Sequence, residues 1–392
     1  MKIEPSDTLK SIGSYAFDEV DRMRDSLTKK GVDVIDFGVG DPKEPTPQFV
    51  RDAAKKAVDD RKTSGYPRNN GTPVFLEAIR DWTKRQFSVD LDTDTEIASN
   101  IGSKEAVFNL PLAFINPVDV VLIPNPGYPP YERGTLFAKG KPVFMNLTAD
   151  NGFFPDLEKI DNKTRKLAKI MWFNYPNSPT GRMATKEYTK QCIDFCHDNN
   201  IILASDEAYS DIYFDKKPIS PLQFTKEGVV SINSLSKRSN MTNYRIGWLA
   251  GDENIIGPYK KLKSNIDSGT CTIIQDAATA ALRDEKHVEE MRKCYKKKRN
   301  IMIAAFKDLG LKDCTPEATF YIWQKVKDGM TSLEFVKKLL DEKTGIVATP
   351  GNILANTADG INPGEGYVRF ALVPTVEKIR EAAERLKNLK LD

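Results

Sequence analysis

Long apolar runs and a surplus of one charge are both missing from this sequence. No segment approaches the length needed to cross a membrane, and residues 1–5 lack the apolar core of a secretory signal. The 58 basic and 55 acidic residues leave a net charge of only +3 and are spread along the chain, which gives no argument for nucleic acid. We therefore expect a cytoplasmic protein that binds neither membranes nor nucleic acid.

Cysteine is also scarce, with five residues in the whole chain. Cys192 and Cys196 lie in a helical pattern, and only His197 stands near them in the sequence. A zinc or redox site needs more ligands at better spacing, so buried, reduced thiols are the favoured interpretation. We expect no metal site.

The middle of the chain alternates short β-rich runs with helical patterns, such as the one over residues 186–199. Several of the β-rich runs are apolar throughout, as is typical of strands covered on both faces. This alternation predicts an α/β domain with a mostly parallel sheet. The predicted strands are residues 118–123, 142–147, 169–174, 201–205, 229–233 and 246–250.

The two ends of the chain have a different pattern. An amphipathic helix is predicted over residues 11–30 and a strand over 34–38. From about residue 285, long charged helices flank short strands; the helices are 286–307, 332–340 and 376–389, and the strands include 320–324 and 368–371. We expect residues 1–45 to join residues 285–392 in a smaller α+β domain, beside a large domain of residues 46–284.

A lysine follows the predicted strand 229–233. Lys237 lies in a Ser-Leu-Ser-Lys sequence with Ser234 and Ser236, and Arg245 comes shortly afterwards. A buried amine beside another cation has a lowered pKa, which an amine needs in order to form a Schiff base. The serines and the arginine offer hydrogen bonds and charge to a phosphate. A lysine in an ordinary polar loop explains this spacing about equally well.

Other polar residues follow neighbouring predicted strands, and the carboxyl ends of such strands are where ligands collect. Asp206 follows the strand 201–205 and is suited to pair with a protonated ring nitrogen, with Tyr209 able to donate to a ring hydroxyl. Asn177 lies in a loop fixed by two prolines and a glycine. Taken singly, Asp206 is more simply a helix N-cap and the Asn177 loop a plain turn.

Two further segments fit a flat phosphorylated ligand. Ser103 and Lys104 stand where a strand-like run meets a helix, and backbone N–H groups at a helix N-terminus bind phosphate. Tyr128 lies in a loop constrained by prolines and is suited to stack on a ring. An ordinary N-cap serine explains the first segment equally well.

In combination and in this order, these motifs resemble the aspartate aminotransferase superfamily, the fold type I enzymes of the class I and II aminotransferases that use pyridoxal 5′-phosphate (PLP). The resemblance covers essentially the whole chain, from the motif at residues 34–42 to that at 366–370, and residues 234–247 are its most specific part. It implies an enzyme that moves an amino group between an L-amino acid and a 2-oxo acid by a ping-pong mechanism.

The resemblance also assigns roles to single residues. Lys237 would form the Schiff base and carry the proton, Asp206 would hold the ring nitrogen protonated, and Tyr128 would stack on the ring. The ring hydroxyl oxygen would be bound by Tyr209 and Asn177, and the phosphate by Ser103, Lys104, Ser234, Ser236 and Arg245. Arg369 would clamp the substrate α-carboxylate, aided by Asn177 and the backbone of Gly40.

Family members are homodimers with shared active sites, and Tyr66 matches a tyrosine that reaches the phosphate of the neighbouring subunit. Residues 14–20, 66–71 and 101–106 resemble the diaminopimelate branch, which includes the LL-diaminopimelate and N-succinyl-diaminopimelate aminotransferases of lysine biosynthesis. Tyr15 would then approach the distal end of the substrate. The segment 267–270 contains no arginine, which argues against an aspartate-type clamp for a second carboxylate.

Three alternatives share most of these residues or this fold. Aminotransferases for alanine, aspartate or aromatic amino acids would need the same cofactor contacts. A PLP-dependent C–S lyase, which expels a leaving group instead, would need them as well. A PLP-binding transcription regulator carries an additional N-terminal DNA-binding domain, and we expect none because the resemblance begins near residue 10.

Overall fold

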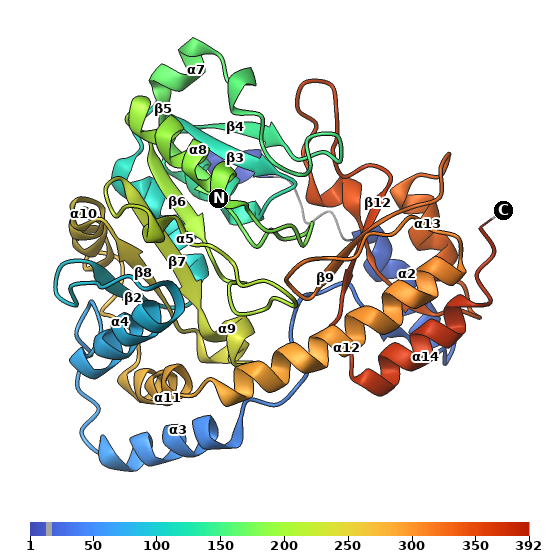
Figure 1. The fold of residues 1–392 in the computed structure, drawn as a ribbon, viewed down its shortest axis with the longest axis horizontal. Coiled ribbons are helices and arrows are strands. Elements are labelled where there is room, and N and C mark those ends of the chain that lie inside the picture. The colour runs from blue at the N-terminus through green and yellow to red at the C-terminus, as the bar shows by residue number, and fades with distance from the viewer. Residues whose placement is uncertain (13–17, 392) are drawn as a thin grey trace.

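A seven-stranded sheet forms the centre of the computed structural model, which describes residues 1–12 and 18–391 (Figure 1). The strand order is β2-β8-β7-β6-β5-β3-β4. All neighbouring strands are parallel except β8, which runs antiparallel to both β2 and β7. The strands are β2 (Ile97–Asn100), β3 (Val120–Asn125), β4 (Lys141–Asn146), β5 (Ala168–Phe173), β6 (Ile202–Asp206), β7 (Val229–Ser234) and β8 (Gly247–Gly251). The predicted mostly parallel sheet is confirmed.

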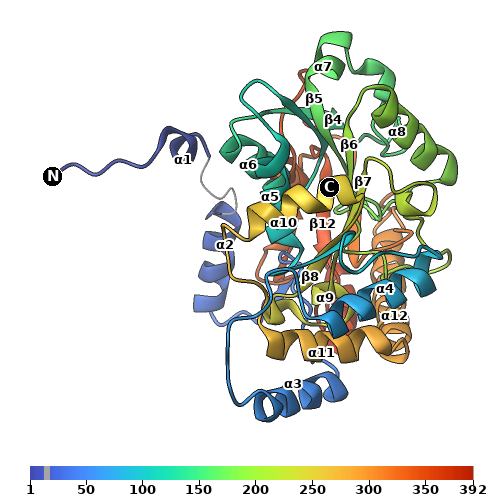
Figure 2. The same ribbon diagram turned by 90° about the vertical axis from the view of Figure 1, so that its left-hand side faces the viewer.

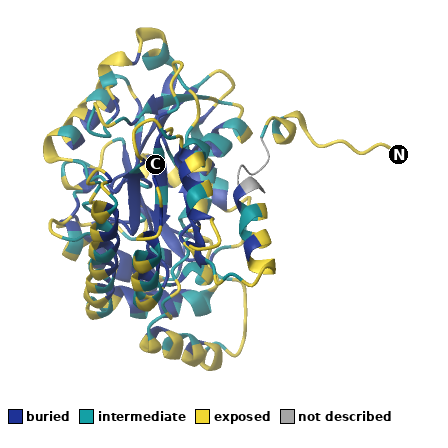
Figure 3. Ribbon diagram, turned by 90° about the vertical axis from the view of Figure 1, so that its right-hand side faces the viewer, coloured by how far each residue is buried: buried dark blue, intermediate teal, exposed yellow. Residues whose placement is uncertain are grey.

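Helices cover both faces of this sheet, and Figure 3 shows the buried strands between them. Alternate strand residues enter opposite cores: Leu203 packs into one core and Ala204 into the other. The first core is completed by α3 (Gln48–Asp60), α4 (Pro73–Phe87), α8 (Lys186–Asp198) and α11 (Thr272–Arg283). The second is completed by α5 (Ser103–Phe114), α6 (Pro129–Phe137) and α10 (Glu253–Lys263). Double coverage explains why these strands are apolar throughout.

A third core combines both ends of the chain, as the sequence predicts. Strand β1 (Ile35–Asp36) pairs in parallel with β10 (Ile346–Val347), and a second sheet has the order β11-β12-β9. These three strands are β11 (Thr349–Pro350), β12 (Tyr367–Ala371) and β9 (Tyr321–Lys325). The surrounding helices are α2 (Asp18–Lys29), α12 (Lys286–Asp308), α13 (Ser332–Leu339) and α14 (Val376–Leu386). The α/β fold with a smaller α+β part is confirmed, whereas the borders near residues 45 and 284 stay a prediction.

Two N-terminal predictions need correction. The helix expected over residues 11–30 is described only from Asp18 to Lys29, and a separate short helix, α1 (Asp7–Ser11), extends away from the body of the molecule (Figure 2). The strand expected over 34–38 is limited to Ile35–Asp36 because its partner β10 is equally short. The other α-helices of the described residues are α7 (Asn162–Leu167) and α9 (Leu235–Arg238). Within the described ranges, no helix combines the length and apolar character needed to span a membrane.

Candidate active site

The predicted reactive lysine lies one turn beyond the sheet. Lys237 belongs to α9, which directly follows β7, and its Nζ donates a hydrogen bond to the carbonyl of Gly40 from the N-terminal segment. The same Nζ lies 5.6 Å from the centre of the Phe320 ring. Burial lowers the pKa of Lys237, and the positive charges of Arg245 and Arg369 lower it further. The environment therefore favours the neutral, nucleophilic amine.

The next two residues fasten this turn to the start of α12. Arg238 is buried and forms ion pairs with Asp211 at 2.9 Å and with Glu285 at 2.8 Å. Ser239 Oγ lies 2.9 Å from Nε2 of His287, in the first turn of α12. The long helix α12 begins beside α9 and α11, runs away from the central sheet and lies next to α14, packing in the third core (Figure 1).

Asp206 lies at the end of β6 and is buried. Its carboxylate accepts a hydrogen bond of 2.6 Å from the Tyr131 hydroxyl and one of 3.2 Å from the backbone N–H of Ala208. Burial raises the pKa of Asp206, and these two hydrogen bonds act in the opposite direction. Tyr131 itself stacks on Trp172 with ring centres 4.6 Å apart, so the donor is held rigidly. The partnership of Tyr131 with Asp206 is not visible in the sequence.

Tyr209 and Asn177 approach the same region from neighbouring loops. The Tyr209 hydroxyl lies 3.1 Å from that of Tyr321 on β9, so this tyrosine also contacts the third core. The Asn177 Oδ1 accepts hydrogen bonds from the backbone N–H and the hydroxyl of Thr180, the latter at 2.7 Å. The loop thereby fixes the amide orientation, as its prolines and glycine predict.

Arg369 projects from β12, one of the strands of the second sheet. Its Nη2 donates to the Gly38 carbonyl at 2.8 Å, and its guanidinium carbon lies 4.7 Å from the centre of the Tyr321 ring. Its buried Nε has no hydrogen-bond partner among the described residues. A guanidinium with a buried, unpaired donor is suited to a carboxylate ligand. Tyr321 also packs directly against Gly40, where any side chain would collide with its hydroxyl.

A cluster of donors lies at the N-terminus of α5. Ser103 opens this helix, whose first N–H groups have no partner within the helix. Arg245 has φ of 51°, and its guanidinium lies so close to Gly102 that a Cβ there would strike it. Ser234 Oγ donates to Ser236 Oγ at 2.9 Å. Lys104, the remaining residue predicted here, is exposed in the first turn of α5.

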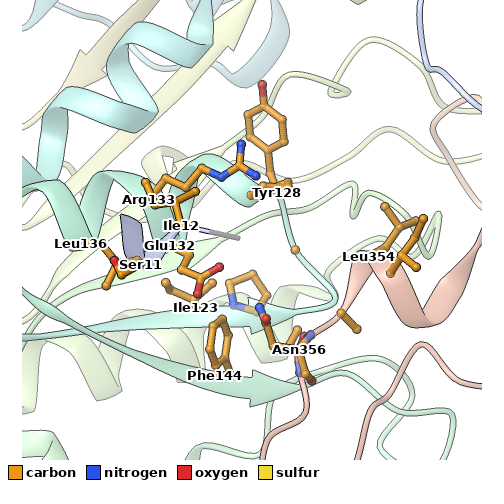
Figure 4. Close-up of a pocket in the computed structure, with 16 residues that line it drawn as sticks. Ser11, Ile12, Ile123, Tyr128, Glu132, Arg133, Leu136, Phe144, Leu354 and Asn356 are labelled. Carbon is orange, nitrogen blue, oxygen red and sulfur yellow. The ribbon is translucent and has the colours of Figure 1, made fainter. Parts of the chain in front are cut away.

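The three other tyrosines predicted to contact cofactor or substrate differ in where they lie. Tyr128 precedes α6, packs edge-on against Tyr131 with ring centres 5.8 Å apart, and lines a cavity together with Glu132 and Arg133 (Figure 4). Tyr66 is 93% exposed, so it makes little contact with its own chain. Tyr15 lies outside the residues that the structure describes.

The donor set fits PLP. A carboxylate stands at one strand end, a lysine with a lowered pKa one turn beyond the next, and an arginine with serines at a helix N-terminus. These are the groups that a pyridine nitrogen, an aldehyde and a phosphate require. Among the described residues, no group of three histidine, cysteine or acidic side chains could hold a metal ion.

Comparison with known proteins shows the family. Residues 32–386 match the family described as aminotransferase class I and II. The LL-diaminopimelate aminotransferase of Aquifex aeolicus is 45% identical over 392 residues, which cover 99% of this chain and 100% of that protein. The LL-diaminopimelate aminotransferase of Halothermothrix orenii is 43% identical and covers 98% of each chain.

Two solved structures are also similar along their whole length. A probable N-succinyldiaminopimelate aminotransferase from Thermus thermophilus is 29% identical with a TM-score of 0.87 and covers 95% of this chain and 100% of its own. An aspartate aminotransferase variant from the same organism is 25% identical with a TM-score of 0.91 and covers 99% of this chain and 100% of its own. The chain therefore belongs to the class I and II aminotransferases and is an enzyme of that family.

Proposed function

We propose that this enzyme uses PLP to transfer an amino group to or from LL-diaminopimelate. The observation that carries the proposal is the convergence of Lys237, Asp206 and Arg369 from three separate parts of the chain. The substrate is supported by relatives at 39–45% identity over nearly the full length that are named LL-diaminopimelate aminotransferases. An N-succinyl derivative is the second candidate, on the likeness to the Thermus protein.

Each contact that PLP requires has a candidate residue in the site. When bound, PLP supplies an electron-accepting pyridine ring and an aldehyde carbon that reacts with amines. Asp206 would hold the ring nitrogen, and Tyr209 and Asn177 would bind the ring hydroxyl oxygen. Tyr128 would contact the ring face. The phosphate would be held by Ser103, Lys104, Ser234, Ser236 and Arg245, with Tyr66 of a second subunit completing the set.

The substrate side follows from Arg369 and Lys237. Arg369 would take the α-carboxylate on its unpaired Nε and orient the Cα–H bond toward the lysine. Lys237, whose pKa is lowered by burial, would accept the proton that leaves Cα of the substrate. The Gly40 carbonyl, which already accepts from Lys237 Nζ, would keep the amine directed into the site.

We further propose a homodimer in which each active site includes Tyr66 of the neighbouring subunit. The match of Tyr66 to a tyrosine that reaches the neighbouring subunit's phosphate in this family supports the arrangement, and a side chain that is 93% exposed is accessible to a second subunit. Tyr15 is proposed to contact the distal end of the substrate.

A half-reaction screen tests the substrate assignment. The enzyme is mixed with single amino acids without a 2-oxo acid, and loss of the visible cofactor absorbance is followed. We expect LL-diaminopimelate to react with a kcat/KM at least about tenfold above those of alanine, aspartate and phenylalanine, equivalent to about 1.4 kcal/mol of transition-state binding. N-succinyl-LL-diaminopimelate forms the parallel arm. Reaction with alanine or an aromatic amino acid but with neither diaminopimelate form would contradict the assignment and leave the family unchanged.

Replacing Arg369 with lysine tests the carboxylate clamp. Lysine keeps the charge but lacks the two-pronged geometry that matches a carboxylate. We expect Arg369→Lys to raise KM by about 10- to 100-fold for every amino acid, on the scale of one or two lost charge-assisted hydrogen bonds. The absorbance spectrum of the cofactor without substrate should stay nearly unchanged. An unaltered KM would place the clamp elsewhere.

A further inference from the structure

Glu207, the residue after Asp206, carries a second buried carboxyl. Glu207 follows the last residue of β6, is 2% exposed and belongs to a region where most strand residues are apolar. Buried carboxylates are normally paired with a cation or coordinate a metal. The contacts of Glu207 are all to neutral groups. A buried charge without a counter-ion is costly, so its retention calls for an explanation.

Four side chains hold this carboxylate, two on each oxygen. Oε1 accepts from Ser220 Oγ at 2.7 Å and from Ser205 Oγ at 2.9 Å. Oε2 accepts from Ser231 Oγ at 3.1 Å and from Asn233 Nδ2 at 3.5 Å. Burial raises the pKa of Glu207 to about 7, and these hydrogen bonds oppose the rise. One oxygen therefore faces its own strand and a loop, while the other faces the neighbouring strand.

The strands joined in this way are the two that carry the proposed cofactor contacts. In the register of β6 and β7, Asp206 lies opposite Ile232, and the N–H of Glu207 donates to the Ile232 carbonyl at 2.8 Å. The backbone pairing thus extends one residue beyond β6. Because side chains alternate along a strand, Asp206 and Glu207 point to opposite faces of the sheet.

We propose that Glu207 is a positioning residue that fixes the spacing between Asp206 and the turn that carries Lys237. This rests on the proposed function, in which Asp206 and Lys237 engage opposite ends of one rigid ring. The ring nitrogen and the carbon that reacts with lysine are para to each other, so the two strand ends must keep a set separation. Displacements of about 1 Å in such a site cost on the order of 100-fold in rate.

Two serine variants separate positioning from stability alone. Ser231→Ala removes a hydrogen bond that crosses from β7 to Glu207, whereas Ser220→Ala removes an equivalent bond to the loop side. Each variant loses its bond to Glu207 and one further bond, which comes from Asn233 Nδ2 in the case of Ser231 and from the Leu222 N–H in the case of Ser220. Both should therefore lower the melting temperature by a similar amount, roughly 2–4 °C. Only Ser231→Ala loosens the connection between the strands.

The readouts are the pH titration of the cofactor's visible absorbance without substrate, and the steady-state constants. We expect Ser231→Ala to shift the titration midpoint by at least about 0.5 pH unit, a threefold change in the protonation equilibrium. It should lower kcat about 10-fold, a tenth of the loss for a full 1 Å displacement, with KM within about twofold. Ser220→Ala should leave the midpoint and kcat as in wild type. Glu207→Ala should have a larger effect than Ser231→Ala. Glu207→Gln keeps the size, and its amide oxygen can still accept from Ser231 and Asn233 while its Nε2 donates to the hydroxyls of Ser205 and Ser220, so it should retain most of kcat.

The outcomes are distinct. Equal responses of Ser231→Ala and Ser220→Ala, or melting changes without any shift of the midpoint, would overturn the positioning role and leave the proposed function standing. A wild-type protein without a titratable cofactor band would overturn the proposed function, and the positioning role with it.

The charge on Glu207 has a separate check in thermal unfolding with PLP bound. The unfolded carboxyl titrates near its ordinary value of 4.5 and the folded one near about 7, so the native protein keeps a proton that the unfolded chain releases in this window. The contribution of Glu207 to the free energy of unfolding therefore falls as the pH rises through this window. The melting temperature of Glu207→Gln minus that of wild type should therefore increase as the pH is raised from about 5 to about 8. A difference independent of pH would overturn the interpretation of Glu207 as a buried carboxyl with a raised pKa.

Discussion

Lys237→Ala should lose at least about 10⁴-fold in turnover, the largest effect expected in this protein, because its amine is proposed to serve as both nucleophile and proton carrier. Arg245, Ser234 and Ser236 remain in place, so the variant should still retain PLP without a covalent bond. Borohydride reduction followed by peptide mapping should find the cofactor on Lys237 in wild type. The exposed Lys216 provides a matched control, since Lys216→Ala should react normally.

The environment of Lys237 explains why this lysine is expected to react among so many in the chain. Burial and two nearby arginines lower its pKa, so a larger fraction of the amine is neutral near pH 7 than for an exposed lysine. Activity that depends on the free amine should therefore rise with pH and level off below the ordinary lysine value of 10.5. A reduced adduct on any other lysine would show that the reactive residue is misassigned.

Asp206→Ala is the second large effect. If Asp206 pairs with the ring nitrogen as proposed, removing its carboxylate should lower the pKa of that nitrogen and weaken the ring as an electron acceptor. We expect kcat to fall by roughly 100-fold or more, equivalent to about 2.7 kcal/mol. The measurement is kcat with a saturating amino donor, together with the pH titration of the cofactor absorbance.

Two variants control for shape. Asp206→Asn keeps the size and the contact with Tyr131 but removes the charge, and should resemble Asp206→Ala. Tyr131→Phe leaves the charge and removes only the 2.6 Å hydrogen bond, so its loss should be smaller, about 10-fold or less on the scale of one such bond. If Asp206→Ala stayed within about threefold of wild type, the carboxylate would serve only the local backbone, to which it is bonded through Ala208.

The strand ends could be predicted from the sequence because parallel, doubly covered strands have an apolar signature. The runs ending near residues 205 and 233 correspond to β6 and β7, and the chemistry of Asp206 and Lys237 follows from their place just after them. The sequence around each strand was enough to predict where the strand ends and which residue follows it. The same argument anticipated Ser103 at the start of α5.

The partners of those residues could not be predicted, because they come from distant segments. Tyr131 is 75 positions from Asp206, and Tyr321 is 112 positions from Tyr209. Nothing in a single sequence states which tyrosine faces which strand end once the chain is folded. Glu207 was hidden for a different reason: its donors are serines and an asparagine, which occur in any polar turn and become informative only when they share one face of a sheet.

The attachment of the Lys237 turn to the base of α12 has a mechanical consequence. The helix α12 has 23 residues and is therefore about 34 Å long at 1.5 Å per residue. Arg238 and Ser239 hold its first end. A tilt of about 5° about this attached end would displace the other end by about 3 Å over that length. The far end bears Met302 and Phe306, which belong to the same core as the strand of Arg369. Because Val288 near the start of the helix belongs to that core as well, a small shift of the Lys237 turn would be carried along the whole helix to the strand of Arg369.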